Sequence, residues 1–451
     1  MTGSVPRASW GRPLRWMKTL FDVRRNEVGP VVIAACGFFF VLTALMLLRP
    51  VRDAIGMVRG VETIRWLFMT TAVVTLALNP VFGFLVGRLR RSLFVAATYG
   101  FFCLTLVVFW VLLTFAPFAI AQGGGQAFYV WFSVINVFGT MVFWALVSDH
   151  FTREQSARLF ALIAIGGTLG AVFGPWLTSR LAQPLGAIHL LPVSAFFLSL
   201  GALAAWRLAR ITPSPMEARM EGEAHASHDH APIGGGAWDG LHAVVRSPYL
   251  AGIAGYVMLM AMMATFVYLT RLQLVAGVAA EPDAMAALLA RIDMWTQVVF
   301  LALQVAMATR FTRRVDTGHA LVLLPLATAL GFASLAAQGA LLVLFLLDAA
   351  NRAVQRGVAR PAREMLFTVV PRNDKYKAKA FIDTFVYRMG DVLGAQMERT
   401  LAGAGGAVGG LAGVAVPLAL AWAVLAMWLG RLHGKRGDLA PPGAGPFSGR
   451  Q

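Results

Sequence analysis

The sequence predicts an all-α membrane protein whose twelve transmembrane helices form two similar six-helix halves. Hydrophobic residues make up 58% of the 451 residues and charged residues only 14%, whereas about 25% of residues are charged in a typical soluble domain. The apolar residues occur in blocks of about twenty, which is the length that crosses a bilayer core as a helix. The sequence lacks short segments in which apolar and polar residues alternate, as they do along the strands of an outer-membrane barrel, so it does not fit that class of protein.

Twelve apolar blocks follow one another along the chain. In the first half they cover residues 28–50, 64–87, 92–116, 127–148, 158–181 and 187–208. In the second half they cover 248–274, 286–309, 319–338, 340–368, 379–401 and 408–430. We therefore expect a basic amphipathic arm at 1–27, a first half at 28–208, a polar cytoplasmic linker at 209–247, a second half at 248–431 and a disordered cytoplasmic tail at 432–451.

The distribution of basic residues predicts the orientation of the chain. The net charge is +17, but the basic residues sit in short clusters between apolar blocks, as the positive-inside rule describes, and do not indicate nucleic-acid binding. The loops near 117–126, 336–340 and 402–410 contain no lysine or arginine. Both termini are therefore expected in the cytoplasm. The two cysteines, Cys36 and Cys103, lie inside apolar blocks and are expected to be inert thiols.

Weak internal similarity indicates that the two halves are repeats. Arg49 closes the first span and Arg271 closes the seventh, each after a long apolar run. Glycines with matching placement occur early in the fifth and eleventh spans: Gly167, Gly170, Gly390 and Gly394. Small residues at such spacing let two helix backbones approach closely. Repeats of this kind build transporters whose site lies between the halves, near the middle of the bilayer.

The tenth span carries the richest set of ionisable residues. Its arginines follow spacings of four, four and three, which places them on one helical face: Arg352, Arg356, Arg360 and Arg363. A central arginine costs about 2.5–3.5 kcal/mol on insertion scales, so its retention needs a reason. We expect Arg352 and Arg356 to bind the anionic group of a substrate, because guanidinium matches carboxylate and phosphate. An internal ion pair with Asp348 or Asp391 is the alternative, and Arg360 and Arg363 either join this site or snorkel to the interface.

Other polar residues are expected to complete this site. Arg49, Arg52 and Arg271 would form an outer cationic gate, although an interfacial anchor has the same pattern. Asp348, Asp53 and Asp391 would hold the arginines when the site is empty. Asp391 or Asp383 is either a proton acceptor or the counter-ion of Arg388. Neutral polar residues assigned to substrate binding accompany these charges: Asn351, Gln355 and Asn136.

Two further charged groups are expected near the ends of the spans. Asp149 with Arg153 and Arg158 resembles a cytoplasmic gate network. Asp293 lies near the outer end of the eighth span and is expected to pair with Arg291.

No motif for catalysis or for a cofactor is found in the sequence. A phosphate-cradling loop, a nucleophile elbow and a paired metal-ligand motif are all missing. The run of His225, His228 and His230 lies in the polar linker, where a solvated loop explains it better than a metal site. We therefore expect neither an enzyme nor a bound cofactor.

Several motifs resemble known transporters. The segment from Gly83 to Arg91 resembles the Gly-x-x-x-Asp-Arg-x-Gly-Arg-Arg loop of the major facilitator superfamily, with Gly87 in place of the aspartate and Arg90 in place of the second glycine. Other segments resemble bacterial members of the ATP:ADP antiporter family, or nucleotide transport proteins. They are Leu48-Arg49-Pro50-Val51-Arg52-Asp53-Ala54, the Phe151–Phe160 segment, and Ala359-Arg360-Pro361-Ala362-Arg363-Glu364-Met365-Leu366-Phe367 with the Lys375–Thr384 segment. That resemblance runs from about Val28 to Arg431 and implies a twelve-helix fold and nucleotide exchange. The binding lysines of the nucleotide members do not map onto this sequence.

These observations predict a secondary transporter of the bacterial inner membrane. It would move an anionic organic solute, phosphorylated or carboxylate-bearing, by alternating access, and nucleotide exchange is one form of this activity. A flippase for an anionic lipid or cell-wall intermediate, and a non-transporting membrane sensor or partner protein, remain the alternatives. The expected partners are the solute and the lipid bilayer, without a nucleic-acid polymer, and the expected state is a monomer.

Overall fold

All regular secondary structure in the described part of the chain is helical. The computed structural model describes residues 24, 27–88, 91–211, 239–310, 317–403 and 408–438. The first six long helices are α2 (Val28–Met57), α3 (Val61–Arg88), α4 (Arg91–Phe115), α5 (Phe118–His150), α6 (Arg153–Leu185) and α7 (Leu190–Ile211). After the short α9 (Asp239–Arg246) come α10 (Pro248–Ala276), α11 (Pro282–Arg310), α12 (Thr317–Gln338), α13 (Leu341–Val354), α14 (Arg360–Leu366), α15 (Arg372–Phe381), α16 (Tyr387–Gly403) and α17 (Val408–Asp438).

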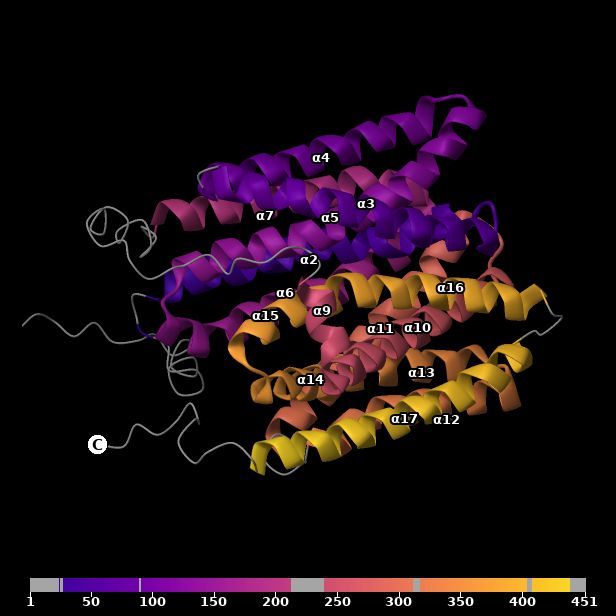
Figure 1. The fold of residues 1–451 in the computed structure, drawn as a ribbon. Coiled ribbons are helices and arrows are strands. Elements are labelled where there is room, and N and C mark those ends of the chain that lie inside the picture. The colour runs from indigo at the N-terminus through magenta and orange to yellow at the C-terminus, as the bar shows by residue number, and fades with distance from the viewer. Residues whose placement is uncertain are drawn as a thin grey trace, which may run out of the picture.

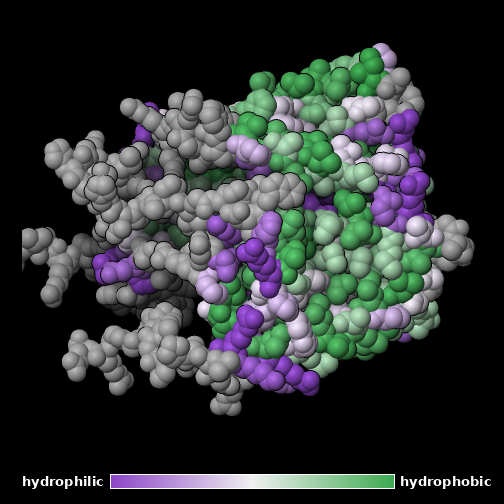
Figure 2. Space-filling view, in the orientation of Figure 1, coloured by the Kyte–Doolittle hydropathy of each residue, from purple (hydrophilic) through white to green (hydrophobic). Residues whose placement is uncertain are grey.

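The helices are built to cross a membrane. Ten helices among the described residues are long and apolar enough to do so. Two further helical segments are continuous but carry charged residues near their middle. One joins α13 and α14 through η3, a π-helix at Gln355–Ala359, and the other joins α15 and α16 through η5, a π-helix at Ile382–Val386. Hydrophobic residues cover much of the surface in view in Figure 2, with hydrophilic residues gathered toward its two ends.

The long helices lie side by side in two groups. Helices α2 to α7 form the first half and α10 to α17 the second, which occupy the upper and lower parts of Figure 1. We call the end at which α2 begins and α17 ends the terminal face, and the other end the opposite face. Each half has its own apolar core. Near the opposite face, Leu272 and Val275 of α10 and Leu289 of α11 join the core of the first half, so apolar packing closes the two halves together there.

Glycines set the closest helix contacts in both halves, as the sequence predicts. A Cβ atom placed on Gly174 of α6 would lie 2.6 Å from the carbonyl oxygen of Thr43 in α2. In the second half, a Cβ on Gly390 of α16 would lie 2.6 Å from the carbonyl oxygen of Met258 in α10. Helix α6 therefore seats on α2, and α16 on α10, in corresponding positions of the two halves. A larger residue at either glycine would force the backbones apart.

The bounds of α2 differ from the expected first span because a proline in the sequence suggested a helix end. The first span was expected to end at Pro50, yet α2 continues through this proline to Met57. Proline lacks only one backbone donor, and in a membrane bundle neighbouring helices compensate for such a defect. As a result, Arg52 and Asp53 lie within a buried helix and not at an exposed end. Outside the described residues lie positions 1–23, 25 and 26 of the arm expected at 1–27, the histidines 225, 228 and 230, and positions 439–451 of the tail expected at 432–451.

Candidate functional site

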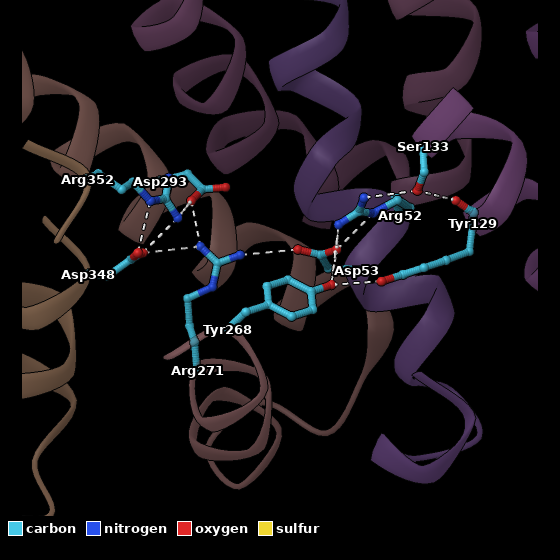
Figure 3. Close-up of polar contacts among 9 residues, drawn as sticks. All are labelled: Arg52, Asp53, Tyr129, Ser133, Tyr268, Arg271, Asp293, Asp348 and Arg352. Carbon is cyan, nitrogen blue, oxygen red and sulfur yellow. Dashed lines mark hydrogen bonds and ion pairs between the residues drawn. The ribbon is translucent and has the colours of Figure 1, made fainter. Parts of the chain in front are cut away.

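Charged side chains from four helices meet in the interior, toward the opposite face (Figure 3). Arg271 of α10 is 1% exposed and donates to Asp293 of α11 at 2.6 Å. Its other terminal nitrogen donates to Asp53 of α2 at 3.1 Å, and Asp348 of α13 lies 3.5 Å from the first. Arg352 bonds Asp348 at 2.9 and 2.7 Å and Asp293 at 3.1 Å. A chain of alternating charges thus runs from α13 in the second half to α2 in the first.

Asp53 is the point at which this chain crosses between the halves. It accepts a hydrogen bond from the Tyr268 hydroxyl of α10 at 2.7 Å, another from the Arg52 side chain and the one from Arg271. Tyr268 also lies 3.1 Å from the hydroxyl of Tyr129 in α5. Polar bonds through Asp53 and Tyr268 therefore tie α10 to both α2 and α5.

The charges in this group are balanced. Three aspartates (Asp53, Asp293 and Asp348) face three arginines (Arg52, Arg271 and Arg352). A buried ion pair is strongly destabilised when one partner is removed, because the other charge is left without compensation. We call these six residues the gate network, since they join the halves on the side of the opposite face.

Three adjoining cavities lie on the other side of the gate network. Residues of both halves line two of them, and residues of the second half alone line the third. The central cavity, about 200 Å³, is lined by Arg49, Arg271, Asp348, Asn351, Arg352, Gln355 and Arg356 with apolar residues. The entrance cavity, about 440 Å³, lies toward the terminal face and is lined by Gln355, Arg356, Arg360, Arg363, Asp383, Tyr387 and Arg388. The N-half cavity, about 360 Å³, is lined by Arg49, Arg52, Tyr129, Asn136, Tyr268, Arg356, Arg388 and Asp391. Arg356 lines all three, so the cavities meet at its side chain.

Two arginines line both the central and the N-half cavity without an ion pair. No carboxylate among the described residues forms an ion pair with Arg49 or with Arg356. Both line the central and N-half cavities. The guanidinium of Arg356 lies 5.3 Å from the ring centre of Phe300 in a cation–π contact, which leaves its donors free. Two uncompensated positive charges therefore face the same space from opposite halves.

A π-helical turn carries Arg356 in the tenth span. The backbone N–H of Arg360 bonds the carbonyl of Gln355, five residues earlier, across η3. Pro361 follows directly; it has no N–H, and its ring clashes with the carbonyl four residues before it in a regular helix. The wider turn relieves this clash, and π-helical turns recur at functional sites. The sequence explains the position of this defect through Pro361.

All eight residues expected to bind substrate line these cavities. Arg49, Arg271, Arg352, Arg356, Asn351 and Gln355 lie around the central cavity, and Arg52 and Asn136 around the N-half cavity. Asn351 accepts a hydrogen bond from Thr328 at 2.7 Å, which fixes its amide at the wall. The structure pairs Arg352 with Asp348, which was the alternative to free anion binding for that residue. Arg388 and Asp391 pair with each other at 3.3 Å.

A second charged group joins the halves at the opposite face. Arg65 of α3 donates to Glu398 of α16 at 2.7 Å, and Glu398 accepts from Gln273 of α10 at 2.8 Å. Glu62 of α3 lies 2.8 Å from Arg399 of α16. Sequence reasoning missed this cluster, because its partners come from separate helices and no local spacing signals them.

Two expected pairings differ in the structure. Asp293 pairs with Arg271 and Arg352, not with Arg291; residues two positions apart on a helix point away from each other, so that expectation was wrong. Arg158 bonds Glu27 at 3.2 Å, while the side chain of Arg153 lies outside the described part and Asp149 has a further interaction of its own.

Glu27 links the beginnings of α2 and α6 at the terminal face. Its carboxylate accepts from Gln155 at 3.1 Å and from the backbone N–H of Arg24 at 2.9 Å, besides Arg158. Burial acts to raise the pKa of Glu27, but these hydrogen bonds and the charge of Arg158 outweigh it and hold the pKa below its ordinary value.

Comparison with known proteins gives the fold. No protein-family model and no curated protein sequence matches the chain. Among solved structures, a point mutant of the nucleoside transporter NupG is similar with a TM-score of 0.61 and 11% identity, over 90% of this chain and 99% of that one. The peptide transporter POT in complex with sulfate matches with a TM-score of 0.61 and 12% identity, over 89% and 95%. A bacterial homologue of the human lysosomal transporter Spinster, inward-facing and unoccupied, matches with a TM-score of 0.55 and 12% identity, over 93% and 100%. The protein is thus an all-α membrane protein with the fold of major-facilitator-type transporters.

Proposed function

We propose that this protein is a secondary transporter that carries an anionic organic solute by alternating access. The observation that carries the proposal is the pair of uncompensated guanidiniums, Arg49 and Arg356, which face one space from the two halves. Arg49 is half-buried and Arg356 is exposed to the cavities. A cation inside a membrane protein that forms no ion pair is costly, so it is retained where a ligand supplies the missing charge. An anion held between Arg49 and Arg356 would draw the two halves together, as a carrier needs at its occluded state.

The arrangement of gates supports the same reading. The gate network and the cluster at Arg65 and Glu398 join the halves on the side of the opposite face. The entrance cavity extends along Arg360 and Arg363 toward the terminal face. With the terminal face assigned to the cytoplasm, as the basic loops predict, this arrangement corresponds to an inward-facing carrier whose entrance attracts anions.

The hydrogen-bond donors that line the cavities indicate the chemical class of the solute. Guanidinium groups match phosphate and carboxylate oxygens through paired N–H donors, and Asn351, Gln355 and Asn136 add neutral hydrogen-bonding groups at the cavity wall. Solutes that combine a phosphate or carboxylate with a polar body fit this set. Nucleotides belong to this class, and the motif resemblance to ATP:ADP antiporters makes nucleotide exchange the first activity to test in the bacterial inner membrane.

The test is counterflow in proteoliposomes that contain the purified protein. Vesicles loaded with one unlabelled anion are offered the same labelled anion, across a panel of ATP, ADP, inorganic phosphate, glucose 6-phosphate and succinate. A charged hydrogen bond is worth about 1.5–3 kcal/mol, so Arg356→Gln and Arg49→Gln should each lower transport efficiency roughly ten- to a hundred-fold. The matched control is Arg210→Gln, because Arg210 is exposed and stacks on Trp206 at 3.8 Å, away from the cavities.

The results separate the alternatives. Counterflow of no anion by folded protein, together with transfer of a labelled anionic lipid between leaflets, would favour a flippase. Absence of both would favour a non-transporting sensor or partner protein. Full activity of both arginine variants would refute the assignment of the site.

A further inference from the structure

Asp391 differs from the other buried aspartates in the contacts that stabilise its negative charge. It is 8% exposed and is the single acidic residue among the described residues that line the N-half cavity. It lies between Gly390 and Gly394, the glycines that seat α16 on α10. The carboxylate of Asp391 therefore lies at the contact between α16 and α10, where it meets Thr265, beside the cavity.

The contacts of Asp391 are few and long. One carboxylate oxygen lies 3.3 Å from the Thr265 hydroxyl, and the other lies 3.3 Å from Arg388. A carboxylate offers about four acceptor positions, and Asp53 in the gate network fills its own with donors from Arg52, Tyr268 and Arg271. Among the buried aspartates that line the cavities, Asp391 therefore has the fewest and longest contacts to stabilise its negative charge.

Charged and titratable groups surround it from each neighbouring element. Those that line the same cavity are Arg49 and Arg52 of α2, Tyr129 of α5, Tyr268 of α10, Arg356 of η3 and Arg388 of α16. Tyr387 of α16 lines the adjoining central cavity. Arg52 is already occupied by Asp53, and Arg49 and Arg356 form the proposed anion site. Arg388 is thus the one cation bonded to Asp391 among the described residues.

We propose that Asp391 is the proton site of this transporter and that the anion and a proton move together. An anion in the cavity beside Arg356 competes with Asp391 for the guanidinium of Arg388. A buried carboxylate that loses its cation is stabilised by taking a proton. One carboxylate oxygen forms an O–H bond with a proton from the cavity water, and this bond breaks again when the cavity opens to the other side. By linkage, the proton favours anion binding as much as the anion favours the proton.

This inference rests on the proposed function, and the test uses the same proteoliposomes. The transported anion of the panel is measured in two modes, counterflow and accumulation driven by a pH gradient with the membrane potential clamped. Asp391→Asn mimics the protonated side chain, so it should keep counterflow and lose accumulation; in a one-proton symport, a gradient of one pH unit supports roughly tenfold accumulation. The control is Glu281→Gln, an exposed acid before α11, which should keep both modes. Asp391→Glu keeps a titratable group and should restore accumulation with a shifted dependence on pH.

A second measurement does not depend on transport. Infrared difference spectra of the reconstituted protein, taken on acidification with inorganic phosphate present, should show a protonated-carboxyl band in the wild type that Asp391→Asn lacks and Glu281→Gln retains. Undiminished accumulation by Asp391→Asn, or an unchanged carboxyl band in that variant, would overturn the proposal. Absence of counterflow in the wild type would count against the proposed function instead, and the infrared band would still decide whether Asp391 binds the proton.

Discussion

The bond between Asp53 and Arg271 gives a direct way to test the gate network. Asp53→Asn changes the charge of one side chain while it keeps the shape and the oxygen that accepts from Tyr268. Within the network, the Asp53–Arg271 pair at 3.1 Å joins α2 to α10, whereas Arg52 and Asp53 belong to the same helix. The substitution therefore weakens the ion pair that must break when the halves separate at the opposite face.

The size of the effect follows from this single contact. A hydrogen bond between charged groups is worth about 1.5–3 kcal/mol. Its loss should move the equilibrium toward the state open at the opposite face by roughly ten- to a hundred-fold. Arg271 keeps Asp293 at 2.6 Å as its partner, and Arg52 keeps hydrogen bonds to Ser133 and Tyr268, so the variant should still fold.

Cysteine labelling measures this shift. The two native cysteines, Cys36 and Cys103, are replaced by serine, and Val137→Cys places a reporter on the wall of the N-half cavity, where Val137 is 38% exposed. A membrane-impermeant maleimide added at the opposite face should label the reporter faster by about the factor above when Asp53→Asn is present. This factor comes from the loss of the one charged bond between Asp53 and Arg271.

A matched variant separates gating from general loss of stability. Asp293→Asn removes a carboxylate from the same network, but its partners Arg271 and Arg352 both belong to the second half. It should lower the thermal stability while it changes labelling of the reporter far less than Asp53→Asn does. Equal labelling rates in folded Asp53→Asn and in the parent would show that this network does not hold the opposite face closed.

Three further variants test the fold around the site. The pKa of Glu27 is held low in the folded protein, so its carboxylate stabilises the fold at pH values above the pKa of this group in the unfolded chain, and this contribution is lost as the pH falls through the folded pKa. Glu27→Gln should therefore lower the free energy of unfolding by about 1–3 kcal/mol at neutral pH. In acid, the thermal unfolding midpoints of the variant and the wild type should converge. Gly170→Val puts a side chain against the backbone of Phe39, so thermal unfolding should occur earlier by the equivalent of about 1–3 kcal/mol or more, and an unchanged midpoint would contradict the packing of α6 on α2. Pro361→Ala restores a backbone donor and lets the π-turn at Gln355–Ala359 relax to regular helix, which should turn Arg356 away from the cavities and reduce uptake without loss of thermal stability.

Hydropathy and spacing alone predicted most of the architecture. Blocks of apolar residues placed the helices to within several residues, because the demand to pair every backbone group inside a bilayer leaves helix as the available structure. The periodicity of the tenth span put its arginines on one face, and those arginines do line the cavities. The glycine pattern likewise predicted close helix contacts. These features are local, so one stretch of sequence contains the information.

Tertiary structure decided which charges are satisfied and which remain free. Asp348 with Arg352, and Arg388 with Asp391, are pairs within one helix that spacing reveals. The bond of Arg271 to Asp53 joins residues 218 positions apart, and no pattern in either helix signals it. Arg49 and Arg356 are free only because the packed halves, over the described residues, bring no carboxylate to them. A side chain's own helix fixes the direction in which it points, but its electrostatic balance depends on every helix that packs around it.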